Sequence, residues 1–275
     1  MISSENRRYL SGIVFIPILI LLSRLGGFFF LFLADLVILL GLIEFYRMAR
    51  RKGANPLMIP GVVSGLVLSW FAFWGAGRNL APVLTLVIIA LMIMELLRKD
   101  SSNALYRIAA TELGVVYVAL MASHLVLLRE LPRVTMQSYG SGSRYVLLVF
   151  LVTWGCDTAA YVIGRRWGRH PLIERVSPKK SVEGSAGGLV FAVAFSLLAK
   201  FWFAGFLSLG QSLTFGFLVG AFGQLGDLVE SLIKRDVNTK DSSGTIPGHG
   251  GVLDRFDSLL FTAPLAYYYL RILLR

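Results

Sequence analysis

The residues most capable of chemistry lie between Asp227 and Asp257, in a polar stretch of an otherwise apolar chain. In a helix, Asp227, Ser231 and Lys234 follow one another at intervals of four and three residues, so they share one face. Asp254 and Asp257 are three residues apart, where a further helix is predicted to begin. Carboxylates gathered in this way repel one another unless cations neutralise them, and Mg²⁺ prefers such hard oxygen ligands. The spacing therefore predicts a cation site, although it does not distinguish which acids bind the cation.

The segment between these acids, residues 240–251, is too rich in glycine, serine and proline to continue a helix. It is expected to form a tight loop whose backbone N–H groups approach phosphate oxygens, with Lys240 and His249 as side-chain donors. Just before the loop, Glu230 shares the helical face of Asp227. Glycine-rich loops are also common as ordinary solvent-exposed loops. Composition alone therefore leaves open whether this segment binds phosphate.

A second polar block, residues 157–184, contains the motifs D-T-A-A-Y-x-x-G-R and S-P-K-K-S-V-E-G. In the second motif, Lys179 and Lys180 provide two point charges for a triphosphate. A helix is predicted to open near Ser181, and its N terminus also favours an anion. The neighbouring arginines are explained as well by topology and by anchoring to lipid headgroups. One helical face of the first motif is predicted to carry Asp157, Tyr161 and Gly164.

The polar residues 231–257 form the pattern S-x-x-K-R-x4-K-D-x-S-x2-I-P-x-H-G-G-V-x-D-R-x-D. This pattern closely resembles the signature of the phosphatidate cytidylyltransferases, also called CDP-diacylglycerol synthases, and the second polar block resembles sequence of the same family. The resemblance is strong over residues 155–257, and every polar position of the signature agrees. Before residue 155 it rests on hydropathy and on the order of the spans. The resemblance implies an integral membrane enzyme that makes a liponucleotide.

In proteins that this chain resembles, acids at the positions of Asp227, Asp254 and Asp257 organise a metal-dependent nucleotide site. The resemblance therefore implies these three as metal ligands and, together with Lys234, as catalytic residues. The implied cofactor is Mg²⁺, and a second, monovalent cation is an open alternative. The implied substrate-binding residues are Ser177, Lys179, Lys180, Ser181, Ser231, Arg235, Lys240, His249, Gly250, Gly251 and Arg255.

The reaction implied by the resemblance is nucleotidyl transfer from CTP to phosphatidic acid, which yields CDP-diacylglycerol and pyrophosphate. The attacking lipid phosphate is already anionic, so strong general-base assistance is less necessary than the neutralisation of two polyanions. Metal held by the acids would clamp the phosphates. Further positive charge is expected from Lys179, Lys180, Lys234 and Arg255. Acyl-chain preference and the choice between CTP and dCTP are left open.

The elements that must position these residues are predicted to be transmembrane helices. Of the 275 residues, 56% are hydrophobic and 16% are charged, and the mean hydropathy is +0.69, which exceeds what a soluble core of this size requires. A helix needs about 20 apolar residues to cross the hydrocarbon. We therefore expect an all-α, polytopic bundle of about nine spans. The spans are predicted at residues 9–23, 28–47, 56–76, 80–97, 105–128, 144–164, 184–206, 212–233 and 256–273.

Basic residues concentrate in alternate connections between these spans, which favours a cytoplasmic N terminus and an outer C terminus. The net charge of +11 has the same origin, and no nucleic-acid motif accompanies it. Two long polar loops, residues 165–183 and 234–255, both fall on the predicted inner side, where a water-soluble cosubstrate would meet a lipid. Residues 1–140 are expected to form a helical scaffold, and residues 141–275 the catalytic region. The predicted location is a bacterial cytoplasmic (inner) membrane, with the active site facing the cytoplasm.

Two other classes of function also bury acids in a membrane protein. A transporter or channel would surround a coupling cation with them, but it predicts polar residues near the midplane and paired repeats, whereas the polar blocks here sit at one membrane edge. Another lipid-phosphate enzyme, such as a polyprenol kinase or a CDP-alcohol phosphotransferase, is a nearer alternative. The sequence lacks both the D-G-x2-A-R-x8-G-x3-D-x3-D pattern of the latter and a Walker A loop.

Three intramembrane acids have no assigned role. Asp35 is expected to face the bundle. Glu44 and Glu112 fit either the cavity or helix-pairing hydrogen bonds. A homodimer is likewise an open alternative, drawn from the family resemblance and from glycine-lined helices.

Overall fold

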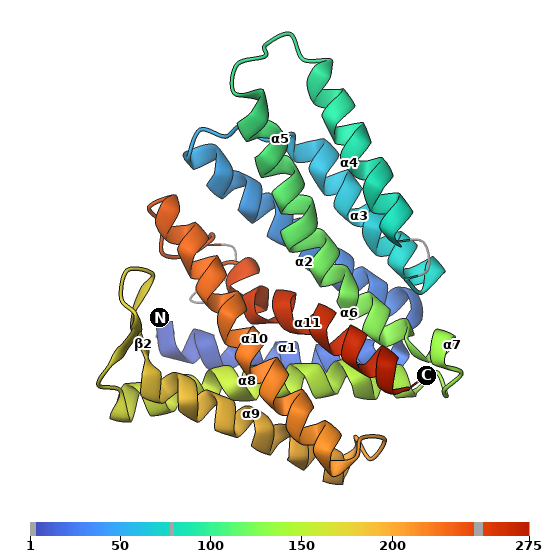
Figure 1. Cartoon of the computed structure of the whole chain (residues 1–275), viewed down its shortest axis with the longest axis vertical. Coiled ribbons are helices and arrows are strands. Elements are labelled where there is room, and N and C mark those ends of the chain that lie inside the picture. Colours follow the sequence, from blue (N-terminus) through green and yellow to red (C-terminus); the bar gives the residue numbers. More distant parts are fainter. Residues whose placement is uncertain (1–3, 78–79, 245–249, 275) are drawn as a thin grey trace.

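A computed structural model describes residues 4–77, 80–244 and 250–274, and these fold mainly into helices (Figure 1). The helices are α1 Ser4–Leu25, α2 Gly27–Arg51, α3 Met58–Gly75, α4 Leu80–Leu96, α5 Ala104–Leu113, the π-helix η1 Gly114–Leu120, α6 Met121–Glu130, α7 Pro132–Thr135, α8 Ser141–Trp167, α9 Val182–Trp202, α10 Leu209–Asp236 and α11 Leu253–Leu273.

Each predicted span coincides with helical structure among the described residues, and α5, η1 and α6 together form the fifth span. Within this part of the chain, six helices are long and apolar enough to cross a membrane, so the protein is a multi-pass membrane protein. Two shorter apolar helices, Phe15–Leu25 and Leu80–Leu96, accompany them. The six are α2, α3, the continuous helix 104–130, α8, α9 and α10.

The connection between α8 and α9 corrects the expectation of an all-α chain. Strands β1, Pro171–Ile173, and β2, Ser177–Ser181, pair in antiparallel fashion, so the predicted loop 165–183 contains a short hairpin. Strands this short need packing partners to be stable. Here Val176 is buried, and its carbonyl oxygen accepts a hydrogen bond of 3.2 Å from Nε of Arg235 on α10. The second predicted loop, 234–255, is shorter than expected, because α10 continues to Asp236 and α11 begins at Leu253.

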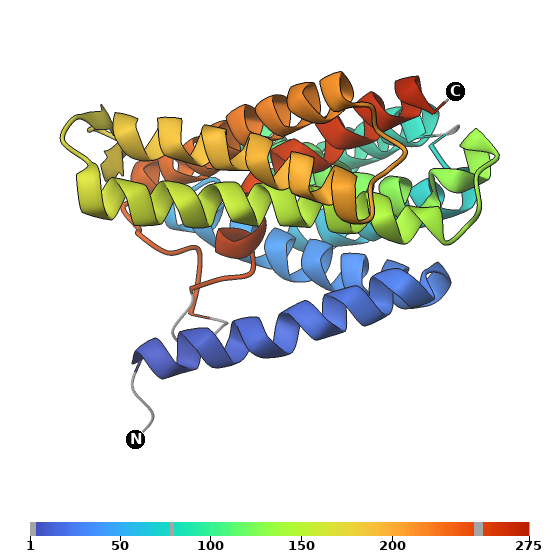
Figure 2. The same ribbon diagram turned by 90° about the horizontal axis from the view of Figure 1, so that it is seen from below.

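The helices pack in two groups that meet at α11 (Figure 1). Helices α8, α9 and α10 pack on one another beside the hairpin, whereas α2, α3 and the helix 104–130 form the second group. Helix α11 packs against both α10 and α6. Helix α1 runs along the edge of the bundle in contact with α2 and α8, and its start and the end of α11 lie toward opposite ends of the molecule (Figures 1 and 2).

Two glycines allow the helices around the polar residues to approach closely. A Cβ at Gly226 would lie 2.8 Å from the carbonyl oxygen of Asp257, so the backbone of α10 passes directly against α11. A Cβ at Gly184 would lie 2.7 Å from the carbonyl oxygen of Ala160, where α9 crosses α8. Small residues at such crossings are typical of membrane helices. They bring the polar residues of three helices to one end of the bundle.

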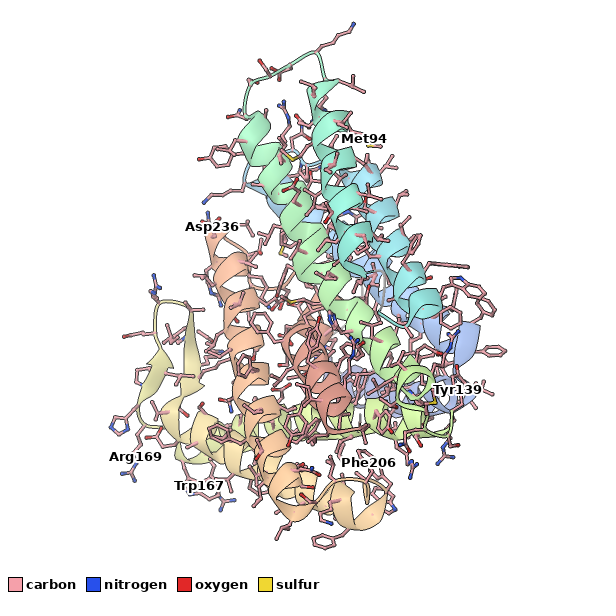
Figure 3. All side chains as sticks on the ribbon, turned by 45° about the vertical axis from the view of Figure 1, so that its right-hand side comes forward. Met94, Tyr139, Trp167, Arg169, Phe206 and Asp236 are labelled. Atoms are coloured by element: carbon pink, nitrogen blue, oxygen red, sulfur yellow. The ribbon has the colours of Figure 1, made fainter. Side chains whose placement is uncertain are left out.

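Large apolar side chains are exposed on the outside of the bundle, as a lipid-facing surface requires. Phe32 on α2, Leu86 on α4 and Phe201 on α9 are each more than half exposed. Figure 3 shows Trp167, Arg169 and Asp236 along one edge of the molecule and Tyr139 on the opposite edge. We call these edges the hairpin end and the Tyr139 end. The segment 167–169 and the end of α10 therefore lie at the hairpin end.

Candidate active site

A cavity of about 610 Å³ lies between α8, the hairpin, α9 and α10. Its size falls in the range that small-molecule ligands occupy. It combines acids from two helices with lysines from β2. The lining residues are Asp157, Ala160, Tyr161, Gly164, Arg165, Leu172, Ser177, Lys179, Lys180, Ser181, Gly184, Ser185, Gln224, Asp227 and Leu228. The predicted face of Asp157, Tyr161 and Gly164 thus lines the cavity, as do four of the predicted substrate-binding residues.

Lys180 is fixed over α10 by the turn from β2 into α9. Ser181 caps α9, and its hydroxyl oxygen accepts a hydrogen bond of 3.1 Å from the backbone N–H of Gly184. This turn holds Lys180 Nζ 2.5 Å from Oδ2 of Asp227, with both side chains partly exposed. Ser231, one turn further along α10, donates a long hydrogen bond of 3.5 Å to Oδ1 of the same carboxylate. Asp227 therefore sits at the inner wall of the cavity with a cationic partner.

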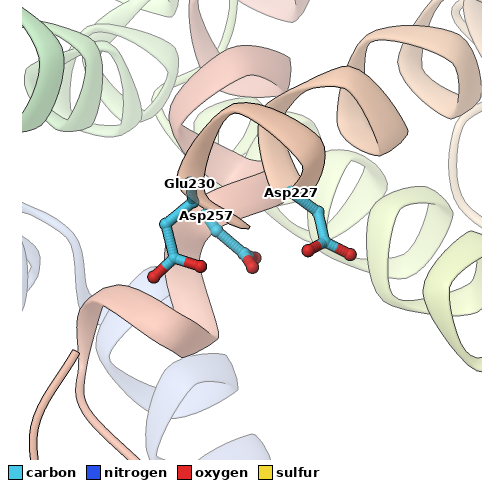
Figure 4. A group of neighbouring side chains, drawn as sticks. All are labelled: Asp227, Glu230 and Asp257. Carbon is cyan, nitrogen blue, oxygen red and sulfur yellow. The ribbon is translucent and has the colours of Figure 1, made fainter. Parts of the chain in front are cut away.

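Three carboxylates gather where α10 meets α11 (Figure 4). Asp227 and Glu230 project from neighbouring turns of α10, and Asp257 projects from α11. One oxygen from each lies within 4.8 Å of the others, a spacing that could hold a metal ion. Asp157 on α8 interacts electrostatically with Asp227 and Asp257 and extends the acidic group into the cavity. We call Asp157, Asp227, Glu230 and Asp257 the acidic cluster.

Lys234 connects the acidic cluster to the loop between α10 and α11. Its ammonium group forms an ion pair with Glu230 and lies 2.6 Å from Oδ1 of Asp254. The other carboxylate oxygen of Asp254 accepts hydrogen bonds from the backbone N–H groups of Ser242 (3.0 Å) and Gly251 (2.7 Å), and from the Ser242 hydroxyl at 2.9 Å. Asp254 thus fastens both ends of the loop to α10. Of the three predicted metal ligands, Asp227 and Asp257 lie together, whereas Asp254 is outside the group of three close oxygens and lies beside Lys234 and Glu230.

The remaining predicted residues have varied surroundings. Arg235 points to the hairpin and to the end of α10, because Nε binds the carbonyl oxygen of Val176 and Nη1 that of Thr239. Lys240 and Arg255 are exposed, and Gly250 has a left-handed backbone with φ of 82°. His249 falls outside the described residues.

Several polar residues of this region were not assigned to the site from the sequence. Glu230 was placed on the correct helical face but without a role. Gln224 lines the cavity and donates a hydrogen bond of 3.0 Å to the carbonyl oxygen of Ser185; its position three residues before Asp227 was a usable signal. Tyr117 of η1 interacts electrostatically with Glu230 and Asp257, and its buried hydroxyl has no hydrogen-bond partner among the described residues. No local pattern indicates Tyr117, although π-helices are frequent at functional sites.

The arrangement suits chemistry on phosphates. A polyanion in the cavity would meet Lys179 and Lys180, and it would meet a cation held by the acidic cluster. The cavity lies beside the hairpin, between helices whose outer faces carry exposed apolar side chains.

Comparison with known proteins gives full-length similarity. The profile of the Cytidylyltransferase family matches residues 6–273. A phosphatidate cytidylyltransferase of Synechocystis sp. is 33% identical over 292 residues, which cover 98% of this chain and 97% of that protein. The phosphatidate cytidylyltransferase of Bacillus subtilis is 28% identical over 272 residues, or 96% of this chain and 97% of that protein. That of Staphylococcus haemolyticus is 33% identical over 264 residues, or 92% of each chain.

Proposed function

Since the chain belongs to the cytidylyltransferase family, we propose that the cavity and the acidic cluster together form the active site of a phosphatidate cytidylyltransferase. The activity is that of a nucleotidyltransferase in phospholipid synthesis, which converts CTP and phosphatidic acid to CDP-diacylglycerol and pyrophosphate.

The observation that carries the assignment is the position of Asp227. This residue lines the cavity, where it pairs with Lys180, and it also belongs to the acidic cluster. A nucleotide whose phosphates lie against Lys179 and Lys180 would therefore end beside the acids. The two lysines would neutralise phosphate charge, while Ser177 and Ser181 offer hydroxyl donors at the same wall.

The acidic cluster fits a hard divalent cation, and Mg²⁺ is the cation we propose. Among the described residues, the lysines paired with the cluster are Lys180 and Lys234, too few to balance its four carboxylates, and this disfavours a cluster that lacks a further cation. Asp227, Glu230 and Asp257 would hold the ion, with Asp254 oriented by Lys234 at its edge. When bound, Mg²⁺ would neutralise charge on the substrate phosphates and on the departing pyrophosphate.

In the proposed reaction, an oxygen of the phosphatidate phosphate attacks the α-phosphorus of CTP, a new P–O bond forms, and the bond to pyrophosphate breaks. The nucleophile carries its own negative charge, so no side chain need remove a proton. The protein's task is to hold two polyanions in line. Lys180 would hold the nucleotide phosphates, and Lys234 would fix Asp254 and Glu230 through its two ion pairs.

We further propose nine spans with the hairpin end in the cytoplasm of a bacterium, where CTP is available. The concentration of basic residues in the connections at this end supports that orientation. The acyl chains of phosphatidic acid would stay in the bilayer, and its headgroup alone would enter. Residues 141–275 would supply the cavity, and residues 1–140 would support it.

The test is pyrophosphate release by the purified protein in detergent. We expect release only when CTP, phosphatidic acid and Mg²⁺ are present together. Replacement of phosphatidic acid by diacylglycerol or a polyprenol, with formation of CDP measured beside pyrophosphate, tests for a lipid kinase, because a kinase transfers the γ-phosphate and leaves CDP. Pyrophosphate release from CTP without lipid would contradict the proposal. Asp227→Asn should abolish release. Asp236→Asn is the matched control, because it changes an exposed acid further along the same helix and should leave the rate unchanged.

A further inference from the structure

Glu44 is a fully buried carboxylate of α2 that reaches the loop between α10 and α11. Its Oε1 accepts hydrogen bonds from the Ser243 hydroxyl (2.6 Å) and the backbone N–H of Val252 (3.0 Å). Its Oε2 accepts from the Ser242 hydroxyl (3.0 Å) and the backbone N–H of Leu253 (2.9 Å). Each oxygen thus binds one hydroxyl of residues 242–243 and one backbone N–H of residues 252–253. Glu44 therefore ties these two segments together, as Asp254 does from the other side.

These backbone contacts lie at the start of α11, where the first N–H groups of a helix have no partner within the helix. A side chain adjacent in sequence usually accepts from such groups. Val252, at the capping position, provides no side-chain acceptor. Glu44 supplies the acceptors from a different helix, 208 residues away in the sequence from Val252. The start of α11, and with it the position of Asp254, therefore depends on α2.

A continuous set of contacts runs from Glu44 to the acidic cluster. The Ser242 hydroxyl lies within hydrogen-bonding distance of both Glu44 and Asp254, and its one proton can serve either carboxylate at a time. Asp254 in turn binds Lys234, which pairs with Glu230. A change at Glu44 should therefore reach the acids through Ser242 and Asp254.

The contact leaves no room for a side chain at Gly251. A Cβ there would collide with both the Ser242 hydroxyl and Oε2 of Glu44. The loop is therefore shaped closely around the Glu44 carboxylate.

We propose that Glu44 is a positioning residue for cytidylyl transfer, which clamps residues 242–243 to residues 252–253 so that Asp254 and Lys234 are held against the acidic cluster. This inference rests on the proposed function and adds to it a role for a residue of the N-terminal helices. Glu44 touches neither the cavity nor the three clustered oxygens, so it acts through the loop.

The decisive variant is Glu44→Gln. The amide has nearly the same shape, but one of its two ends becomes an NH₂ group that cannot accept. The serine hydroxyls can turn to meet it, whereas a backbone N–H cannot. We expect hydrogen exchange of the Val252 and Leu253 amides to accelerate about 10-fold in the protein without substrates, because one of the two loses its acceptor.

The kinetic expectation follows from the position of the clamp. Changes at residues that orient a metal site commonly cost about 10- to 100-fold in metal affinity or activity. We expect a loss of this size in kcat and a matching rise in the Mg²⁺ concentration for half-maximal activity, with KM for CTP changed by less than about 3-fold because the cavity is untouched. Glu44→Asp keeps the charge but is shorter, and its loss should be smaller.

Glu130→Gln is the matched control. Glu130 is equally buried and also accepts hydrogen bonds, from Tyr139 and Arg133, but it lies at the Tyr139 end. The Glu130→Gln variant should change neither the hydrogen exchange of the Val252 and Leu253 amides nor the Mg²⁺ dependence of the rate per folded molecule. If Glu44→Gln does not fold, Ser243→Ala removes one donor from the clamp and should shift exchange and kcat in the same direction by about 3-fold.

Unchanged exchange at Val252 and Leu253 in Glu44→Gln would overturn the clamp. Faster exchange with wild-type kcat and Mg²⁺ dependence would overturn its role in positioning. If the wild-type protein released no pyrophosphate from CTP and phosphatidic acid, the proposed function would fail instead. The exchange measurement would then still decide whether Glu44 holds the loop.

Discussion

The two ends of the bundle both bury charged side chains, but they differ in whether each charged group has hydrogen-bond or ion-pair partners that compensate its burial. At the Tyr139 end, Arg129 is fully buried, and its guanidinium donates to the carbonyl oxygens of Ser23, Arg24 and Tyr139. The neighbouring Glu130 accepts from the Tyr139 hydroxyl at 2.8 Å and from Arg133 at 3.3 Å. Each charge there has partners of the complementary kind. We call this group the Arg129 network.

At the hairpin end the charges do not balance. The acidic cluster gathers four carboxylates, and the lysines that the structure pairs with them are Lys180 and Lys234. Lys234 is also shared with Asp254. Burial of a charge is costly unless the charge is paired. The acids of the cluster must therefore take up protons or meet a further cation, and the second alternative is the one we propose. The charges of the Arg129 network need neither, which fits a role in folding.

Of the substitutions that compare the two ends, Asp257→Asn should have the largest effect, because it removes one charge from the acidic cluster. We expect pyrophosphate release to fall by about 10³-fold, because a group that organises the transition-state charge is lost. The melting temperature without Mg²⁺ should be unchanged or higher, because repulsion within the cluster falls. Thermal unfolding in detergent and the release assay measure the two quantities. A variant with a tenth or more of the wild-type rate would remove Asp257 from the site.

Arg129→Met tests the Tyr139 end and should have the opposite outcome, namely lower stability with an unchanged rate. Loss of one partner from a buried charged network lowers the free energy of unfolding by about 3 kcal/mol. The rate per folded molecule should stay near that of the wild type, because no Arg129 contact involves the cavity. Thermal unfolding, with activity scaled to the folded fraction, provides the measurement. An unchanged melting temperature would mean that the network contributes little to folding.

The smallest effects concern two lysine–aspartate pairs that share α10. Lys180→Ala should lower kcat/KM for CTP by about 10-fold, because a charge-assisted contact at the cavity is lost. Lys52 pairs with Asp236 at 2.9 Å, and both side chains are more than half exposed. Lys52→Ala should therefore change the free energy of unfolding by no more than about 0.5 kcal/mol and leave the rate unchanged. Equal kinetic effects of the two substitutions would contradict the assignment of Lys180 to the site.

The six long helices were predictable because each contains an apolar stretch of the length that lipid requires, and the sequence correctly indicated that a helix opens near Ser181. The hairpin was not predictable from the sequence, because its strands are short and lie in a basic segment. It is stabilised by packing of Val176 and by a hydrogen bond from Arg235, which is 59 residues away. Tertiary contacts of this kind leave no local pattern.

The candidate site was predictable where it follows helical spacing. Asp227, Ser231 and Lys234 lie on one face as expected, and Lys179 and Lys180 line a cavity. The spacing of the acids along the sequence did not indicate which hydrogen-bond or ion-pair partner each would have. The i, i+3 relation of Asp254 and Asp257 suggests a shared role, but Asp254 lies in the first turn of α11 and turns back to the loop, whereas Asp257 faces α10. The contact of Glu44 with Ser242 spans 198 residues, and no motif indicates it.

Gly226 limits which substitutions the crossing of α10 and α11 can tolerate. It has no functional group, yet the distance between Asp227 and Asp257 depends on the close crossing of α10 and α11 that it permits. A single added methyl group would act as a wedge, and the two carboxylates on either side of the crossing would move apart. The spacing of the acids is thus controlled by a missing side chain, so a substitution that alters no charge and no donor can still disable the chemistry.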